Sequence, residues 1–208
     1  MKKFIPILLI IFILPLSACG KGDYMASNMS EVTHIFYVGQ VGSDYASISV
    51  GQREEPYQKD GVSKPKVDFS LISLYVEGYY LMRLDCIVTV NGVSQEVTLE
   101  CVGGNYMYDL AYALSADDEI TISYLNKSMT FENASKNFAV SEKRALEIAR
   151  EQLSTELKEH QNKAEFYLRV LGQEGEGLHT LFWAFTMVCT DKSTYNCVIN
   201  AQTGQIIA

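Results

Sequence analysis

Histidine is scarce in this sequence, and the short motifs that mark common catalytic sites are missing. The three histidines, His34, His160 and His179, are far apart and form no HExxH pattern, so no zinc site is predicted. The chain has no CxxC pair, no GxSxG elbow, no P-loop and no glycine-rich dinucleotide fingerprint. The acidic run at 117–119 lacks the spacing of a calcium loop. We therefore expect no enzyme activity, no catalytic residue, no metal and no cofactor.

Positive charge is also in short supply. Lys and Arg number 17 against 25 Asp and Glu, which gives a formal net charge of −8. Binding to nucleic acid needs a basic surface that neutralises phosphates, so no nucleic-acid partner is expected. The acidity is typical of a surface that stays soluble and is repelled by anionic headgroups.

No hydrophobic run is long enough for a comfortable membrane-spanning helix. The apolar stretch Phe4–Leu14 falls short of the roughly 20 residues that cross a bilayer. Lys2 and Lys3 precede it and small residues follow it, which is the layout of a cleavable export signal over residues 1–18. An export signal of this kind is removed from the mature protein.

The residues at the end of this signal carry a family resemblance. Leu16-Ser17-Ala18-Cys19 resembles the lipobox of bacterial lipoproteins, in which the cysteine is acylated and becomes the first mature residue. The resemblance implies lipidation of Cys19 and anchoring in membrane lipid at the extracytoplasmic face of the cell membrane. Two acyl chains on one thiol are enough for stable anchoring. An ordinary secretory signal with an incidental cysteine is the alternative.

Four further cysteines, Cys86, Cys101, Cys189 and Cys197, follow Cys19. An even number outside the cytoplasm allows disulfides, and each pair that is close in sequence flanks a predicted hairpin turn. Local disulfides, one between Cys86 and Cys101 and one between Cys189 and Cys197, are therefore one expectation. Four buried free thiols are the other, because cysteine packs well as a small hydrophobic residue.

Strand patterns dominate the chain up to residue 132. Residues 19–32 are small and polar and indicate a flexible tether. Residues 33–132 then show about eight short runs rich in β-branched and aromatic residues, among which Tyr45–Val50 alternates cleanly. This part is predicted to be an antiparallel β-sandwich, immunoglobulin-like in size.

The period of the apolar residues changes after 133–137. Ser141 is a good N-cap, and apolar residues repeat at i+4 from Ala145 to Leu157, which predicts a helix over Glu142–Glu159. Three strand patterns follow the helix. The predicted fold class is thus α+β, with a β-sandwich domain at 33–132 and a small helix-plus-three-strand domain at 138–208.

Three short segments distinguish the second domain: Ser141–Ala149 at the helix start, the strand Trp183–Met187, and the ending Val198–Ile207. Together they resemble a PepSY domain, except that Asn200 stands where the family often has aspartate. PepSY domains are small non-catalytic modules of exported and membrane proteins, including peptidase propeptides. The resemblance implies that this protein binds or restrains an extracytoplasmic protein partner, such as a peptidase.

Tyrosine is abundant, with 13 in the chain, and it supports a second hypothesis. Six crowd the predicted sandwich: Tyr75, Tyr79, Tyr80, Tyr106, Tyr108 and Tyr112. Such rings form platforms for glycans or proteins when they are exposed, although strand cores use them too. The alternative function is therefore cell-surface binding of a solute or glycan, or adhesion, through the sandwich. A concave tyrosine-lined face would favour it, whereas an exposed edge strand or apolar groove on the C-terminal domain would favour the protein partner.

Overall fold

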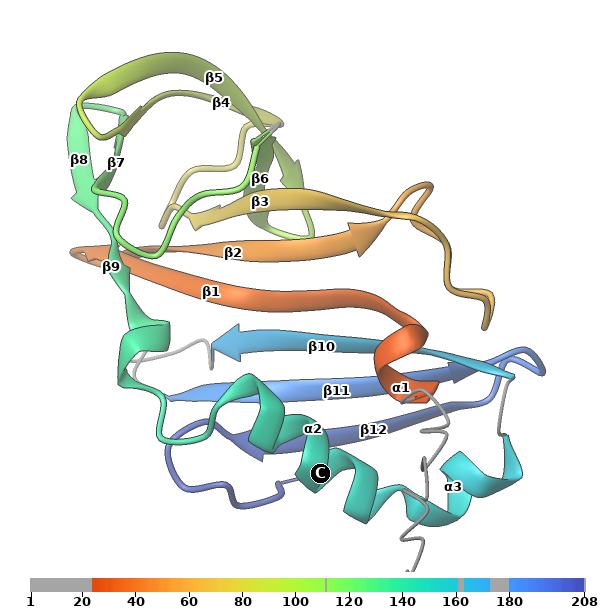
Figure 1. Ribbon diagram of the computed structural model, residues 1–208. Helices are drawn as coiled ribbons and strands as arrows, with labels where there is room; N and C mark the ends of the chain where they lie inside the picture. The colour runs from red at the N-terminus through yellow and green to blue at the C-terminus, as the bar shows by residue number, and fades with distance from the viewer. Residues whose placement is uncertain (1–23, 111, 161–162, 173–179, 208) are drawn as a thin grey trace, which may run out of the picture.

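The computed structural model describes most of the chain (Figure 1). The described residues are 24–110, 112–160, 163–172 and 180–207. The predicted signal peptide at 1–18, the predicted lipidation site Cys19 and the first part of the predicted tether lie outside them. Among the described residues, no helix combines the length and the apolarity that crossing a membrane requires.

Twelve strands of the described residues form one mixed sheet. The strands are β1 (Met29–Val41), β2 (Asp44–Glu54), β3 (Lys66–Tyr75), β4 (Arg83–Val90), β5 (Val93–Val102), β6 (Asn105–Leu110), β7 (Ile120–Tyr124), β8 (Lys127–Thr130), β9 (Glu132–Asn133), β10 (Ala164–Gly172), β11 (Leu181–Cys189) and β12 (Thr194–Asn200). Their order across the sheet is β12-β11-β10-β1-β2-β3-β6-β5-β4-β7-β8, and β9 pairs with β1. The helical segments are α1 (Tyr24–Ser27), the 3-10 helix η1 (Ala134–Asn137), α2 (Glu142–Gln152) and α3 (Ser154–Glu159).

The predicted fold class, a β-sandwich followed by a helix-plus-three-strand α+β module, is wrong. β1 pairs with β2 on one side and with β10 on the other, so strands from 33–132 and from 138–208 share one sheet. The predicted β-sandwich followed by a PepSY-like module is therefore corrected to a single mixed sheet with three short α-helices among the described residues. Alternation along a strand shows which side chains are buried but not which distant strand pairs with it, and this is why the sequence suggested two units.

The fold begins inside the segment predicted to be a tether. Tyr24 of α1 donates a hydrogen bond from its hydroxyl to the Ala164 carbonyl, at 2.8 Å. Ser30 of β1 is fully buried, and its hydroxyl donates to the Glu165 carboxylate of β10, also at 2.8 Å. The predicted flexible tether at 19–32 is therefore too long, because from Tyr24 onward the chain is packed against β10.

The sheet from β1 to β8 curls around a hydrophobic core. β9 pairs with β1 at Tyr37 and Val38, so the chain after β8 returns to the strand from which this part of the sheet starts. A Cβ at Gly39 of β1 would lie 2.9 Å from the Met129 side chain of β8, so glycine permits this close approach. The largest fully buried side chains of this core are Tyr37, Ile48, Ile72, Leu74, Leu84, Leu99, Tyr106, Leu110 and Ile120.

A second core lies between α2 and the strands β10, β11 and β12 (Figure 1). The Ser141 side chain caps α2 as the sequence predicts, and the buried indole of Trp183 donates to the Val140 carbonyl at 2.8 Å. The helix predicted over Glu142–Glu159 is confirmed at its start but is divided at Leu153 into α2 and α3. The apolar face of α2 thus packs against one face of β11 and β12.

Candidate functional site

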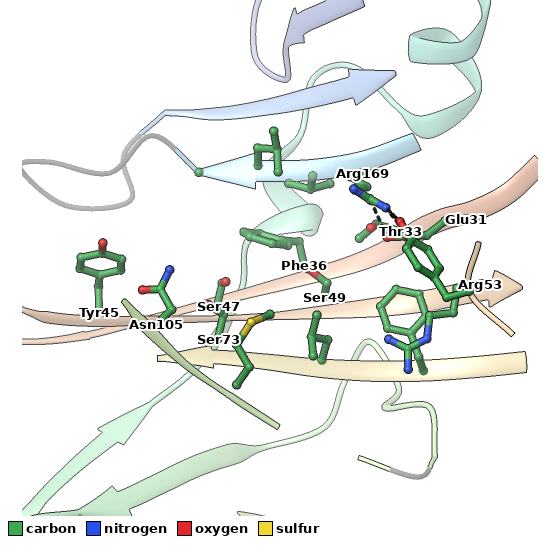
Figure 2. Close-up of a pocket in the computed structure, with 17 residues that line it drawn as sticks. Glu31, Thr33, Phe36, Tyr45, Ser47, Ser49, Arg53, Ser73, Asn105 and Arg169 are labelled. Carbon is green, nitrogen blue, oxygen red and sulfur yellow. Dashed lines mark hydrogen bonds and ion pairs between the residues drawn. The ribbon is translucent and has the colours of Figure 1, made fainter. Parts of the chain in front are cut away.

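A cavity of about 470 Å³ lies where β10 departs from β1 (Figure 2). The parallel pairing of these strands runs from Met29 to Val32 and from Phe166 to Leu168, and the cavity is formed beyond it. Small-molecule sites typically occupy about 300–1,000 Å³, so the volume suits a small ligand. Its lining residues are Glu31, Thr33, Phe36, Tyr45, Ser47, Ser49, Arg53, Tyr57, Phe69, Leu71, Ser73, Asn105, Met107, Arg169, Val170, Leu171 and Gly172.

Strand alternation explains which side chains reach this cavity. On β2, Ser47 and Ser49 line it, while Ile48 between them is fully buried in the core. The antiparallel register places Ser47 opposite Ser73 of β3, and Ser73 opposite Met107 of β6. Because strand side chains alternate between faces, these residues form one outward surface across three strands.

A pair of tyrosines marks one end of the cavity. Tyr45 of β2 lies opposite Tyr75 of β3, and their rings stack with centroids 4.9 Å apart and planes 18° apart. Asn105 of β6 lies at the same end in Figure 2. The stacked rings combine flat apolar faces with polar hydroxyl tips, and the Asn105 amide can both donate and accept hydrogen bonds.

Serine hydroxyls line the middle of the cavity. Within the described residues, no side-chain hydrogen bond involves the hydroxyl of Ser47, Ser49 or Ser73. Each of these hydroxyls can donate one hydrogen bond and accept two. Thr33, also in the lining, has a buried hydroxyl oxygen without a partner in the described part of the chain. The middle of the cavity therefore offers hydrogen-bonding capacity that the described residues do not use.

Arg169 and Glu31 form one ion pair at the opposite end. Arg169 Nε donates to Glu31 Oε1 at 2.7 Å and its Nη2 donates to Oε2 at 2.6 Å, and the Tyr57 hydroxyl is a further partner of the guanidinium. Burial disfavours the Arg169 cation, but the hydrogen bonds and charge of Glu31 outweigh it and raise the Arg169 pKa. Burial raises the pKa of Tyr57 as well. Both groups therefore keep their protons at neutral pH.

Arg53 provides a second charged group at this end. It pairs with Asp109 of β6, and its Cζ lies 5.1 Å from the centroid of the Phe69 ring. The stacking on Phe69 and the pairing with Asp109 fix the plane of the guanidinium. Figure 2 shows Arg53, Glu31 and Arg169 together, with the serines between them and Tyr45.

The chemistry of the cavity suits binding of a neutral polar ligand. The Tyr45 ring, stacked on Tyr75, lies at one end, and serine hydroxyls without a side-chain partner among the described residues lie in the middle. Guanidinium groups lie at the other end. Arg169 and Arg53 are each neutralised by a carboxylate, so the cavity has little excess charge to attract an anion. A ligand with a flat apolar face and several hydroxyl groups would match all three parts.

The six tyrosines predicted as a platform are not gathered on one surface. Tyr106 is buried, with its hydroxyl donating to the Leu81 carbonyl at 2.8 Å, whereas Tyr80 is 90% exposed on the loop before β4. Tyr75 takes part in the site through its stacking on Tyr45. The sequence did not predict Tyr45 as a site residue. The alternation of outward and core residues over Tyr45–Val50 could have indicated that Tyr45 lies on the same face of β2 as the serines.

The four cysteines are free thiols in the structure. In the strand register Cys86 lies opposite Val97 and Cys101 opposite Tyr106, so the members of this pair are not neighbours. Cys197 lies opposite Phe185, four residues before Cys189 on the same strand. Cys86, Cys189 and Cys197 are buried, and burial raises the pKa of Cys86 to about 12. Cys101 is partly exposed, so three of the four free thiols are buried and one is not.

Other polar residues considered in the sequence have structural partners. Asp117 of the acidic run pairs with Lys136 at 2.6 Å, and Asp118 accepts a hydrogen bond from the Ser115 backbone. His34 bonds to the Glu142 carboxylate through Nδ1 at 2.8 Å. His160 lies near Cys189 and Asp191. The sequence did not predict this group, because His160 is far from both residues along the chain.

Comparison of the chain with protein-family models, with curated proteins and with solved structures finds no match. The cavity therefore has no ligand assigned by similarity. The class of ligand is therefore inferred from the residues that line the cavity and from their contacts.

Proposed function

We propose that this protein is a lipid-anchored, extracytoplasmic binding protein whose cavity takes a neutral, hydroxyl-rich solute or glycan segment. The anchoring part of the proposal is supported by the lipobox-like residues ending in Cys19. The binding part is supported by the cavity and its lining side chains. No catalytic step is included, because the lining shows positioning groups rather than an activated nucleophile and base.

One observation carries the proposed ligand class: the stacked Tyr45 and Tyr75 lie next to serine hydroxyls that have no partner among the described residues. An aromatic face is stabilised by contact with apolar C–H groups of a ligand. The serine hydroxyls replace their hydrogen bonds to water with hydrogen bonds to ligand hydroxyls. Arg169 and Arg53 present rigid guanidinium donors because each is held by a carboxylate. Sugars combine apolar faces with hydroxyl edges and thus fit this pattern.

A glycan array followed by calorimetric titration of the hits would test the cavity. Tyr45→Ala is expected to weaken binding by about 10-fold or more, which corresponds to about 1.4 kcal/mol. Ser73→Val should also weaken binding, since it removes a hydroxyl from the middle of the cavity. Tyr80→Ala is the matched control, because Tyr80 is 90% exposed on a loop that does not line the cavity. Equal binding by the Tyr45 and Tyr80 variants would contradict the proposed site.

The anchor can be tested separately in cells. Cys19→Ser is expected to abolish incorporation of a labelled fatty acid and to move the protein out of the membrane fraction. Cys101→Ser is the control, because it removes a partly exposed thiol from the folded region. Unchanged labelling of the Cys19 variant would show that the cysteine near the export signal is incidental.

A protein partner, such as the peptidase suggested by the resemblance, is the second candidate function. Tyr80, Leu81 and Met82 favour it, since they are 90%, 62% and 76% exposed on one loop. The edge strand β12 gives less support to a protein partner. An exposed edge could accept a strand of the partner, but here Ile207 N already donates to the Val198 carbonyl of β12 at 2.8 Å. Photo-crosslinkers at residue 81 and at residue 73 would distinguish the two functions. Capture of one exported protein through residue 81 alone would favour the protein partner.

A further inference from the structure

Three side chains with metal-binding atoms lie close together near α3 and the end of β11. Figure 1 shows α3 beside this end of the sheet. His160 follows α3, Cys189 is the last residue of β11, and Asp191 lies in the turn between β11 and β12. One imidazole nitrogen, the thiol sulfur and one carboxylate oxygen lie within 4.8 Å of one another. His160 Nδ1 is 3.8 Å from Asp191 Oδ2. The described residues contain no other such group.

The turn after β11 fixes the position of the carboxylate. Asp191 Oδ1 accepts hydrogen bonds from the Ser193 backbone at 2.9 Å and from the Ser193 hydroxyl at 2.6 Å. Cys189 N donates to the Ser193 carbonyl at 2.9 Å, which closes the turn beneath the thiol. Because Oδ1 is already occupied, Oδ2 is the oxygen left toward His160.

Tyr195 orients the imidazole in the same way. Its hydroxyl lies 3.3 Å from His160 Nε2, so it can accept the Nε2 proton and leave the Nδ1 lone pair toward Cys189 and Asp191. Histidine ligands of metals commonly hold their second nitrogen by such a hydrogen bond. The tautomer is inferred from this contact.

Burial differs among the three groups in a way that suits a metal site. Cys189 is 1% exposed and the His160 side chain 17%, whereas the Asp191 side chain is 60% exposed. Two groups are therefore held by the fold, and the third lies at the surface where an ion can enter. The solvent side leaves room for a water molecule as a fourth ligand.

We propose that His160 Nδ1, Cys189 Sγ and Asp191 Oδ2 bind a divalent transition-metal ion of the zinc type, with water as the fourth ligand. Zinc accepts nitrogen, sulfur and oxygen ligands at about 2.0–2.3 Å in a tetrahedron, which places ligand atoms roughly 3.3–3.8 Å apart. The ligand atoms lie within 4.8 Å of one another, so the three groups must close by up to roughly 1.5 Å, and the exposed Asp191 can supply part of this movement. Binding releases the thiol proton to solvent as the thiolate bonds to the metal.

Calcium and magnesium are excluded from the proposal, because both prefer sites made of oxygen ligands alone. The metal site is also independent of the proposed binding cavity. Ala164 and Cys189 pair at the start of β10, whereas the residues of that strand that line the cavity begin at Arg169. Five residue steps of about 3.3 Å separate Ala164 from Arg169, roughly 17 Å along the strand.

Titration of the full lipid-anchored chain in detergent with Co²⁺, and then with Zn²⁺, would test the site. We expect one equivalent of Co²⁺ to give a thiolate-to-metal absorption band that Zn²⁺ removes. Zn²⁺ at 100 times its Kd should raise Tm by about 5–11 °C, while Ca²⁺ should not. Cys189→Ser should abolish the absorption band, and Asp191→Asn should weaken Zn²⁺ binding by about 10-fold or more.

Cys101→Ser is the control, because Cys101 is the partly exposed thiol of another part of the sheet, and it should bind Co²⁺ as the unaltered chain does. Asp191→Asn keeps the Oδ1 acceptor for Ser193, so this variant tests the site even where loss of the buried thiol disturbs folding. An absorption band that persists in the Cys189 variant would overturn the proposal. So would equal Zn²⁺ affinity in the Asp191 variant, or no binding by the unaltered chain.

Discussion

Arg169 of β10 and Glu31 of β1 form a bidentate ion pair, with donor–acceptor distances of 2.7 and 2.6 Å. The two residues are 138 positions apart in the sequence, and their pair joins β1 to β10. It also forms one end of the candidate binding cavity. The same two side chains therefore tie the C-terminal strands to the rest of the sheet and shape the site.

The first prediction concerns this junction. Glu31→Gln removes the charge opposite a guanidinium that is only 32% exposed, so we expect a loss of about 1–3 kcal/mol in the free energy of unfolding. Urea unfolding should remain a single transition, with Trp183 fluorescence and far-ultraviolet circular dichroism changing together. Trp183 is the one tryptophan of the chain and lies in the core under α2. Two separate transitions in the unaltered chain would contradict a single folding unit.

The second prediction concerns Asp44, which is 1% exposed at the turn between β1 and β2. Burial by itself raises its pKa, but the Lys127 ammonium at 2.6 Å, the Glu77 backbone N–H and the Tyr124 hydroxyl outweigh this and leave the pKa below its usual value. A lowered folded-state pKa stabilises the fold above the unfolded pKa of about 3.9, and this stabilisation is lost as pH falls through the folded value.

Asp44→Asn should therefore cost about 1–3 kcal/mol at pH 7 and less in acid. Urea unfolding of both proteins at pH 7 and pH 3 would measure the difference. Asp60→Asn is the control, because Asp60 pairs with Lys64 on an exposed loop. A difference between the Asp44 variant and the unaltered chain that does not shrink at pH 3 would contradict the assignment.

The third prediction concerns His34 on β1 and Glu142 in the first turn of α2. The hydrogen bond that His34 Nδ1 donates to the Glu142 carboxylate is the main cause that raises the His34 pKa, against a smaller opposing effect of burial. Because the folded-state pKa is raised, the stabilisation is complete below the unfolded value of about 6.5 and is lost as pH rises through the folded value.

Glu142→Gln should shift the His34 pKa downward in a titration followed by NMR of the imidazole protons. It should destabilise the protein more at pH 6 than at pH 8. Glu147→Gln is the matched control on the same helix, since Glu147 pairs with Arg144 and not with His34. An unchanged His34 pKa in the Glu142 variant would show that the contact is not kept in solution.

The fourth prediction compares two buried glutamates near Tyr167. Glu165 is fully buried and accepts hydrogen bonds on both oxygens, from Ser30 and from the Gly61 backbone, each at 2.8 Å. Glu54 is 1% exposed; its Oε1 accepts two longer hydrogen bonds, from Gln58 N at 3.1 Å and from the Tyr167 hydroxyl at 3.4 Å, and its Oε2 has no partner among the described residues. Glu165→Met leaves two buried donors unpaired and should cost at least about 2 kcal/mol, whereas Glu54→Met should cost less. Thermal and urea unfolding of both variants would give the order, and an inverted order would contradict this account.

Much of the local structure could be predicted from the sequence. The alternation over Tyr45–Val50 matches the buried and outward positions of β2, and the Ser141 cap marks the start of α2. These features depend on side chains that are neighbours along the chain, so their pattern is visible without knowledge of the fold. The candidate site was less predictable, because Tyr45 was read as part of a strand and not as part of a surface.

The sequence by itself determined where strands and the main helix form, through the periods of two and 3.6 residues. Only the tertiary structure decided that β1 pairs with β10, and that the predicted sandwich and α+β domain are therefore one sheet. It also brought Arg169 to Glu31 and His160 to Cys189 and Asp191. Such contacts join residues far apart in the chain, and local periodicity carries no information about which distant element supplies the partner.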